Sequence, residues 1–125
     1  MSDEEQPAYR EHRLRRFGSC RRPGNVEAWH RLSGILNQAK KFEDAIVAAV
    51  IAIRLNDKCA EAWTELGYAY KELKNWEKAA KALVIAIECD PKKGRPYDYL
   101  SEILRKLDDP EAAEEVLRRK KELSE

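Results

Sequence analysis

Two histidines and three cysteines are the side chains of this 125-residue chain best suited to chemistry, but their spacing does not bring them together. His12 and His30 are isolated, and no spacing indicates a Ser-His-Asp or Cys-His group. Cys20, Cys59 and Cys89 lie 39 and 30 residues apart and form no C-x-x-C pair. Separate free thiols in a reducing compartment are therefore favoured over a zinc or redox site. We expect no metal and no cofactor.

The remaining patterns do not indicate an enzyme either. The five glycines are scattered and form no phosphate-binding loop. Carboxylate pairs such as Glu61 and Glu65 have the spacing of a solvated helix surface, which is their usual explanation. Hydrophobic residues make up 43% of the chain and charged residues 38%, a balance that suits amphipathic helices and excludes a low-complexity chain. We therefore expect a folded protein without catalytic activity.

An internal repeat organises most of the chain. Residues 60–93 contain tryptophan, two residues, Leu-Gly, two residues, tyrosine, and later alanine, a large apolar residue and proline. A shift of 34 residues in either direction aligns this stretch with its neighbours without a gap. The matches include Trp63 with Trp29 and Tyr97, Leu66 with Leu32 and Leu100, and Ala79 with Ala45 and Ala113. Residues 50–53 and 84–87 are both Val-Ile-Ala-Ile. Gly67 becomes Ser33 and Ser101, which preserves small size, and Pro91 becomes Asp57, which preserves a loop residue.

This pattern resembles the tetratricopeptide repeat (TPR) family. The resemblance covers residues 26–125 as three repeats, 26–59, 60–93 and 94–125. It implies an all-α fold, a right-handed superhelical solenoid of antiparallel helix pairs. Residues 1–25 do not share the repeat and form either a basic N-terminal tail or a short helix. The regular register would also suit an engineered repeat protein.

Capping signals place the helices within each repeat. We expect the first helices at residues 26–39, 60–73 and 95–107, and the second helices at 42–55, 76–89 and 110–123. Asn25 can cap the first of these helices, and Asp109-Pro110-Glu111 is a clear helix start. Short connections force each pair to be antiparallel. Small residues let the two helices cross closely, at Ser33 with Ala45, Gly67 with Ala79, and Ser101 with Ala113.

The two ends of the array differ. The Val-Ile-Ala-Ile segment of the first two repeats becomes Arg-Arg-Lys-Lys at residues 118–121. This substitution predicts a terminal helix whose outer side is solvated, with a basic patch for an acidic partner as the alternative. The helix at residues 26–39 has no matched repeat before it to cover its apolar side.

The resemblance implies a concave groove, lined by the first helices, that receives an extended peptide or a helix of a partner. Tyr68 and Tyr99 are the predicted anchors because exposed tyrosines favour interfaces, although each of these positions can also be an ordinary solvated surface. The groove-facing residues expected from helical spacing are Glu27, His30, Arg31, Gly34, Asn37 and Gln38 in the first repeat, Glu61, Thr64, Glu65, Tyr68, Lys71 and Glu72 in the second, and Arg95, Asp98, Tyr99, Glu102, Arg105 and Lys106 in the third.

One family function can be tested residue by residue. TPR domains that bind the C-terminal carboxylate of Hsp70 or Hsp90 use lysine and asparagine in the first repeat, asparagine in the second, and lysine with arginine in the third. The corresponding residues in this chain are His30, Gly34, Glu65, Arg95 and Tyr99. Only Arg95 fits, and Glu65 would repel a carboxylate. We therefore expect no chaperone-tail binding.

Two further hypotheses compete with groove binding. The chain could be a self-assembling scaffold that forms a homo-oligomer through its repeat ends or faces. Residues 10–22, with six Arg against one Glu, could bind nucleic acid, but few aromatic residues accompany them, so this signal is weak. The longest apolar run has nine residues, too few to span a bilayer, and the N-terminus lacks a signal-peptide pattern. We expect a cytoplasmic protein without membrane contact.

Overall fold

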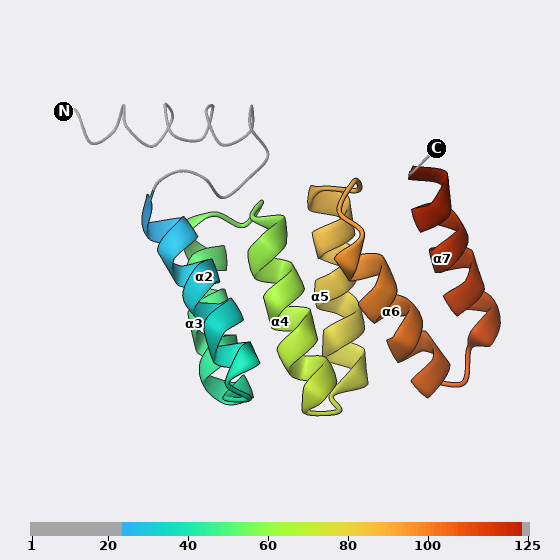
Figure 1. The fold of residues 1–125 in the computed structure, drawn as a ribbon, viewed down its shortest axis with the longest axis horizontal. Coiled ribbons are helices and arrows are strands. Elements are labelled where there is room, and N and C mark those ends of the chain that lie inside the picture. The colour runs from blue at the N-terminus through green and yellow to red at the C-terminus, as the bar shows by residue number, and fades with distance from the viewer. Residues whose placement is uncertain (1–23, 124–125) are drawn as a thin grey trace.

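The computed structural model describes residues 24–123, which form six helices and no strand. The helix pairs follow one another in chain order, with α2 and α3 together at one end and α7 at the other (Figure 1). Their bounds are α2 (Gly24–Gln38), α3 (Phe42–Leu55), α4 (Ala60–Glu72), α5 (Trp76–Cys89), α6 (Arg95–Lys106) and α7 (Pro110–Leu123). Consecutive helices pair as α2 with α3, α4 with α5 and α6 with α7, so the predicted all-α solenoid of helix pairs is confirmed. The predicted tail or short helix lies outside the described residues.

The sequence located the second helices correctly and the first helices to within two residues. α3, α5 and α7 have the predicted bounds. α4 and α6 end one residue earlier than predicted. The prediction that Asn25 caps the first helix is wrong, because α2 begins at Gly24 and Asn25 therefore lies inside the first turn. Asp109 does cap α7, since its side chain accepts a hydrogen bond from the Ala112 backbone N–H at 3.2 Å.

The turn inside each helix pair depends on one residue with left-handed backbone geometry. Lys40, Lys74 and Asp108 have φ of 64°, 64° and 65°, and they recur at the repeat spacing. In each turn the next residue donates a backbone hydrogen bond across the helix end, as Asn75 does to the Tyr70 carbonyl at 2.9 Å. These bonds satisfy carbonyls that the helix leaves unpaired. They compensate for a backbone conformation that residues other than glycine rarely adopt.

The close crossing within each pair uses the predicted small residues. Ala45, Ala79 and Ala113 are completely buried. Ser33 adds a hydrogen bond across the first pair, from its hydroxyl to the Ala45 carbonyl at 2.8 Å. At Gly67 a Cβ atom would lie 2.6 Å from Leu83 Cγ, so no side chain fits there without displacing Leu83.

An aromatic ring fastens each of the last two repeats to the loop before it. Trp63 donates its indole N–H to the Asp57 carbonyl at 2.9 Å, and Tyr97, at the same repeat position, donates its hydroxyl to the Pro91 carbonyl at 2.8 Å. These bonds hold the connection between one helix pair and the next.

The cysteines differ from the predicted set of free thiols. Cys59 is buried at the start of α4, where its sulfur accepts a hydrogen bond from the Ala62 N–H, and it is disulfide-bonded. The prediction of a free thiol is therefore wrong for Cys59. Cys89 is free, and burial raises the pKa of its thiol.

Among residues 24–123, no helix has both the length and the apolar character needed to cross a membrane.

Gly67→Ala should destabilise the fold by about 1–3 kcal/mol, because the added Cβ would overlap Leu83. Gly34→Ala is the matched control, since a Cβ there would meet only the carboxylate end of a glutamate side chain, at 3.3 Å. Urea denaturation followed by circular dichroism measures both variants. Equal stability of the two variants would contradict the proposed crossing.

Candidate functional site

The first helices of the three pairs, α2, α4 and α6, contact one another in sequence and line a shared pocket. The pocket has a volume of about 240 Å³. It lies where the sequence predicted a groove between the first helices. Its lining residues come from all three helices: Gly34, Asn37, Gln38, Glu65, Tyr68, Arg95 and Tyr99.

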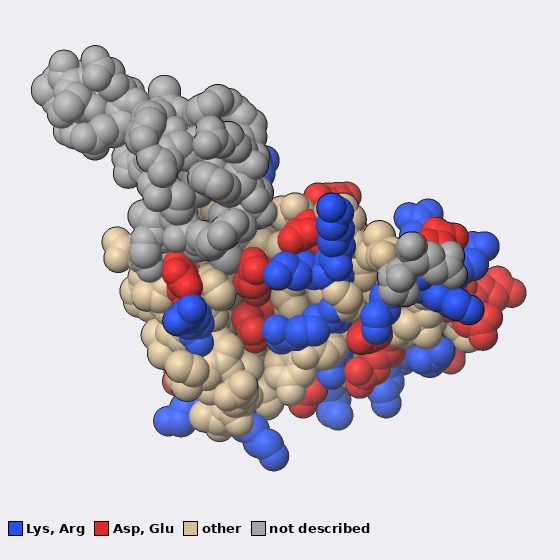
Figure 2. Space-filling model, turned by 45° about the horizontal axis from the view of Figure 1, so that its top comes forward, with Lys and Arg blue, Asp and Glu red and all other residues tan. Residues whose placement is uncertain are grey.

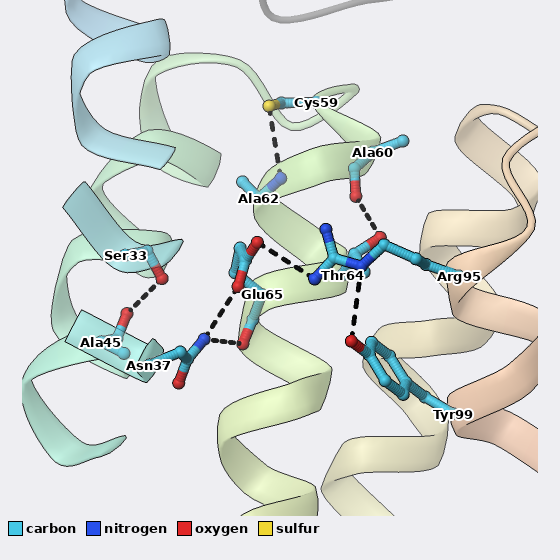
Figure 3. A network of polar contacts seen from close by, with 10 residues as sticks. All are labelled: Ser33, Asn37, Ala45, Cys59, Ala60, Ala62, Thr64, Glu65, Arg95 and Tyr99. Atoms are coloured by element: carbon cyan, nitrogen blue, oxygen red, sulfur yellow. Dashed lines mark hydrogen bonds and ion pairs between the residues drawn. The ribbon is translucent and has the colours of Figure 1, made fainter. Parts of the chain in front are cut away.

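Glu65 of α4 connects the other two helices of this pocket (Figure 3). One carboxylate oxygen accepts a hydrogen bond from the Asn37 amide at 2.9 Å, and the other forms an ion pair with Arg95 at 3.3 Å. The Asn37 amide also donates to the Glu65 backbone carbonyl at 3.1 Å. The Glu65 side chain is only 12% exposed, whereas that of Arg95 is 56% exposed. A ligand entering the pocket would therefore meet the guanidinium before the carboxylate.

A second donor of Arg95 binds within its own helix. Its Nε donates to the Tyr99 hydroxyl at 3.4 Å, and its guanidinium lies 5.5 Å from the Tyr99 ring centre. Burial opposes the charge of Arg95, but the Tyr99 hydrogen bond and the Glu65 carboxylate outweigh burial and raise the pKa of the guanidinium. Arg95 is thus a stable cation held over an aromatic ring.

A second cation, the amine of Lys71, lies close to the rings of both tyrosines. The Lys71 amine is 5.1 Å from the Tyr68 ring centre and 5.4 Å from that of Tyr99. It forms ion pairs with Glu72 at 2.9 Å and Glu102 at 3.4 Å, and only 7% of the side chain is exposed. Although burial opposes the charge, these carboxylates raise the pKa of Lys71. The cation and its carboxylates hold the two tyrosine rings together across α4 and α6.

The aromatic rings form a row across three helices. The ring centres of Tyr68 and Tyr99 are 5.1 Å apart, and Phe42, at the start of α3, meets the Tyr68 ring edge-on at 6.3 Å. Phe42 was not among the predicted site residues because it lies on a second helix, and only its place at the turn brings it beside Tyr68. These partly exposed rings offer apolar contact area next to the polar pocket.

Acidic and basic side chains are intermixed on the face of the molecule drawn in Figure 2. Lys93 pairs with Glu61 at 3.3 Å, and Lys120 of α7 pairs with Asp98 at 2.8 Å. Exposed pairs of this kind contribute little stability, about 0–1 kcal/mol each. Breaking them on partner binding would therefore cost little.

The structure separates the predicted groove residues into groups. Seven line the pocket: Gly34, Asn37, Gln38, Glu65, Tyr68, Arg95 and Tyr99. Six others take part in ion pairs: Glu27, Arg31, Glu61, Glu72, Asp98 and Glu102. Arg105 and Lys106 are exposed at the end of α6, and His30 is partly buried on α2.

Three of the predicted groove residues are buried, so their side chains are not freely accessible to a partner. Thr64 is 4% exposed and donates its hydroxyl to the Ala60 carbonyl at 2.8 Å within α4. Asn37 is 4% exposed, and Lys71 is 7% exposed. Helical spacing identifies the side of the helix but not the burial, because the neighbouring helix decides how deep each side chain lies.

No cluster of His, Cys, Asp and Glu within residues 24–123 has the arrangement of a metal site. The groove residues can form hydrogen bonds, ion pairs and aromatic contacts, which are the interactions of recognition.

The comparisons place one repeat in a known family. The tetratricopeptide repeat model matches residues 60–93. A comparison with curated protein sequences found no match.

Solved structures share the fold over most of the chain. MamA from Desulfovibrio magneticus RS-1, in a structure from residue 41 to its end, has 25% identity and a TM-score of 0.74 over 82% of this chain. The type III secretion translocator chaperone SycD of Yersinia enterocolitica, solved as an alternative dimer, has 21% identity and a TM-score of 0.76 over 80% of this chain and 76% of its own. The second TPR of Spaghetti (RPAP3), bound to the HSP90 peptide SRMEEVD, has 17% identity and a TM-score of 0.75 over 79% of this chain and 92% of its own. This chain spans 58% of the MamA chain.

Protonation of His30 should reduce stability in acid. Burial lowers the pKa of His30, although the charges of Glu61 and Glu27 oppose this effect. Near pH 6.5, the usual pKa of histidine, the unfolded chain therefore binds more protons than the folded chain, and the free energy of unfolding falls as the pH falls. Urea denaturation at about pH 7.5 and about pH 5.5 should show a smaller fall for His30→Gln than for the unchanged protein. Equal falls would contradict the assignment.

Proposed function

Because residues 60–93 of this chain are a tetratricopeptide repeat, in a solenoid of three similar helix pairs, we propose that the protein is an interaction module that binds a peptide segment of a partner protein in its concave groove. Its role is binding without catalysis. The partner lies across α2, α4 and α6, and the pocket around Glu65 and Arg95 is the centre of the contact.

The pocket that all three first helices line is the observation that carries this proposal. A site built from three repeats recognises a segment long enough to reach across them, which an isolated side chain on one helix cannot do. The exposed guanidinium of Arg95 and the hydroxyls of Tyr68 and Tyr99 are suited to the backbone and side chains of an extended peptide.

The buried amide of Asn37 also supports binding at this position. Its oxygen points away from Glu65 (Figure 3) and is buried without a hydrogen-bond partner. An unpaired buried acceptor costs free energy. An N–H group of a partner would satisfy this oxygen if binding exposed it, since it is fully buried in this structure.

The same geometry argues against a free carboxylate as the recognised group. Glu65 already neutralises Arg95, and a carboxylate placed beside Arg95 would lie close to the Glu65 oxygens. The partner segment is therefore an internal, uncharged or mixed-charge stretch and not an acidic C-terminus. Residues 10–22, whose sequence gave only a weak signal for nucleic-acid binding, lie outside the described residues.

The peptide SRMEEVD should not bind this protein, because Glu65 repels its carboxylates. Isothermal titration calorimetry measures the interaction, with the second TPR of RPAP3, the protein solved with this peptide, as the positive control. Saturable binding of the peptide to this chain at micromolar concentration would contradict the prediction.

Peptides selected from a random phage-displayed library on the full chain should bind through the groove. Arg95→Ala should weaken their affinity about tenfold, because it removes a central exposed donor. Arg118→Ala is the matched control, since Arg118 is similarly exposed but lies on α7 outside the pocket. Selected peptides that respond equally to both variants, or to neither, would contradict groove binding.

A further inference from the structure

The rings of Phe42, Tyr68 and Tyr99, which we call the aromatic row, lie beside the polar pocket. They come from α3, α4 and α6, and all three residues are partly exposed. Neighbouring rings are tilted by 63° and 50° and do not stack flat on one another. The row therefore presents ridges with notches between them, a surface suited to small, rigid apolar groups.

The pocket lets a ligand backbone come close to α2 at this point. Gly34 lines the pocket and occupies the repeat position that Tyr68 has in α4. A Cβ atom on Gly34 would meet Glu65 Oε2 at 3.3 Å, so even a small side chain would narrow the pocket. The absence of a side chain leaves room for a chain that lies between α2 and the aromatic row.

The accessible polar groups around the aromatic row can donate hydrogen bonds. The Arg95 side chain is 56% exposed, and a guanidinium only donates. The Tyr99 oxygen already accepts a bond from Arg95 Nε, so its own proton is available to an acceptor on a ligand. Gln38, which is exposed and lines the same pocket, carries an amide that also donates.

The strongest acceptors of the site are occupied or enclosed. The Glu65 side chain is 12% exposed, and its two carboxylate oxygens are bonded to Asn37 and Arg95. The side-chain oxygen of Asn37 is buried. The groove thus offers donors more readily than acceptors, and it suits a ligand that is rich in acceptors and poor in donors.

A stretch of prolines has this hydrogen-bonding character. Proline has no backbone N–H, and a polyproline II helix has no internal hydrogen bonds, so its carbonyls are available as acceptors. An extended chain of other residues would add one N–H per residue. Each N–H enclosed in the groove without an acceptor would cost free energy.

The dimensions of the aromatic row agree with this type of chain. A polyproline II helix rises about 3.1 Å per residue, so two residues span about 6 Å. The ring centres are 6.3 Å apart between Phe42 and Tyr68 and 5.1 Å apart between Tyr68 and Tyr99. Proline rings at neighbouring turns of such a helix can therefore contact successive rings of the row.

A helix of a partner fits the same surface less well. Its backbone groups are already paired within the helix, so the donors of the groove would find few acceptors. A docked helix also needs a broad apolar surface. Among the residues that line the pocket, only Tyr68 and Tyr99 carry large rings, and the others are polar, charged or glycine.

We propose that the partner segment is proline-rich and binds as a polyproline II helix, with its proline rings on the aromatic row and its carbonyls accepting hydrogen bonds from Arg95 and Tyr99. This inference rests on the groove binding proposed above and specifies the chemistry of the ligand. Aromatic-lined grooves recognise such segments because the polyproline II helix is already formed and loses little entropy on binding. Lys71, buried beneath Tyr68 and Tyr99, likewise orders the rings in advance.

NMR titration of the full chain with capped decaproline tests the proposal, with a capped Gly-Ser peptide of equal length as the control probe. Decaproline should bind saturably and the Gly-Ser peptide should not. Tyr68→Leu should weaken decaproline binding about tenfold, because it removes an aromatic ring from the centre of the row. Tyr68→Phe, which keeps the ring, should weaken binding less. Val47→Ala is the matched control outside the groove, since Val47 is 58% exposed on α3, and it should leave binding unchanged.

Circular dichroism should show that these variants keep the helix content of the unchanged protein. The proposal would be overturned if decaproline did not bind, if both probes bound equally, or if Tyr68→Leu and Val47→Ala had the same effect. The library-selected peptides separate this failure from that of groove binding. If those peptides depend on Arg95 while decaproline does not bind, the groove is a binding site for a different chemistry. If they do not depend on Arg95, groove binding itself fails.

Discussion

The close approach of the two helices in each pair is the constraint on which the rest of the structure depends. It requires small residues at the crossing: the Ser33 hydroxyl bonds to the Ala45 carbonyl, and Gly67 lies against Leu83 and the Ala79 carbonyl. Both alanines are completely buried. Because the crossing leaves no space, the large side chains are directed to the edges of the pair, where they pack against the next pair. The solenoid follows from this, since each pair is stable only with a neighbour.

The groove is a consequence of the same packing. Adjacent first helices come close enough for one side chain to reach across, and Glu65 uses this proximity to bind Asn37 on one side and Arg95 on the other. Lys71 plays a similar part beneath the tyrosines. These contacts order the groove, and if it binds a partner as proposed, this order would reduce the entropy lost on binding. The mixed charge of the surface would then favour selectivity between partners.

The first and last helices of the described repeats differ in the polarity of their exposed residues. α7 presents Arg118 and Lys121 where the earlier second helices present apolar residues, and it is solvated. α2 presents Leu32 and Ile35 to solvent, where the same positions in later repeats are buried.

The sequence by itself determined the repeat, the second helices to the residue, the small crossings and the side of each first helix that faces the groove. These features are local, since helical periodicity and residue size are properties of the chain. The sequence misjudged Asn25, which lies inside α2, and the state of Cys59. Only the tertiary structure decided that Thr64 and Lys71 are buried, that Phe42 meets Tyr68, and that Glu65 joins three helices. Each of these depends on how far apart neighbouring helices lie, a distance that the packing of several side chains sets together and that no single residue spacing encodes.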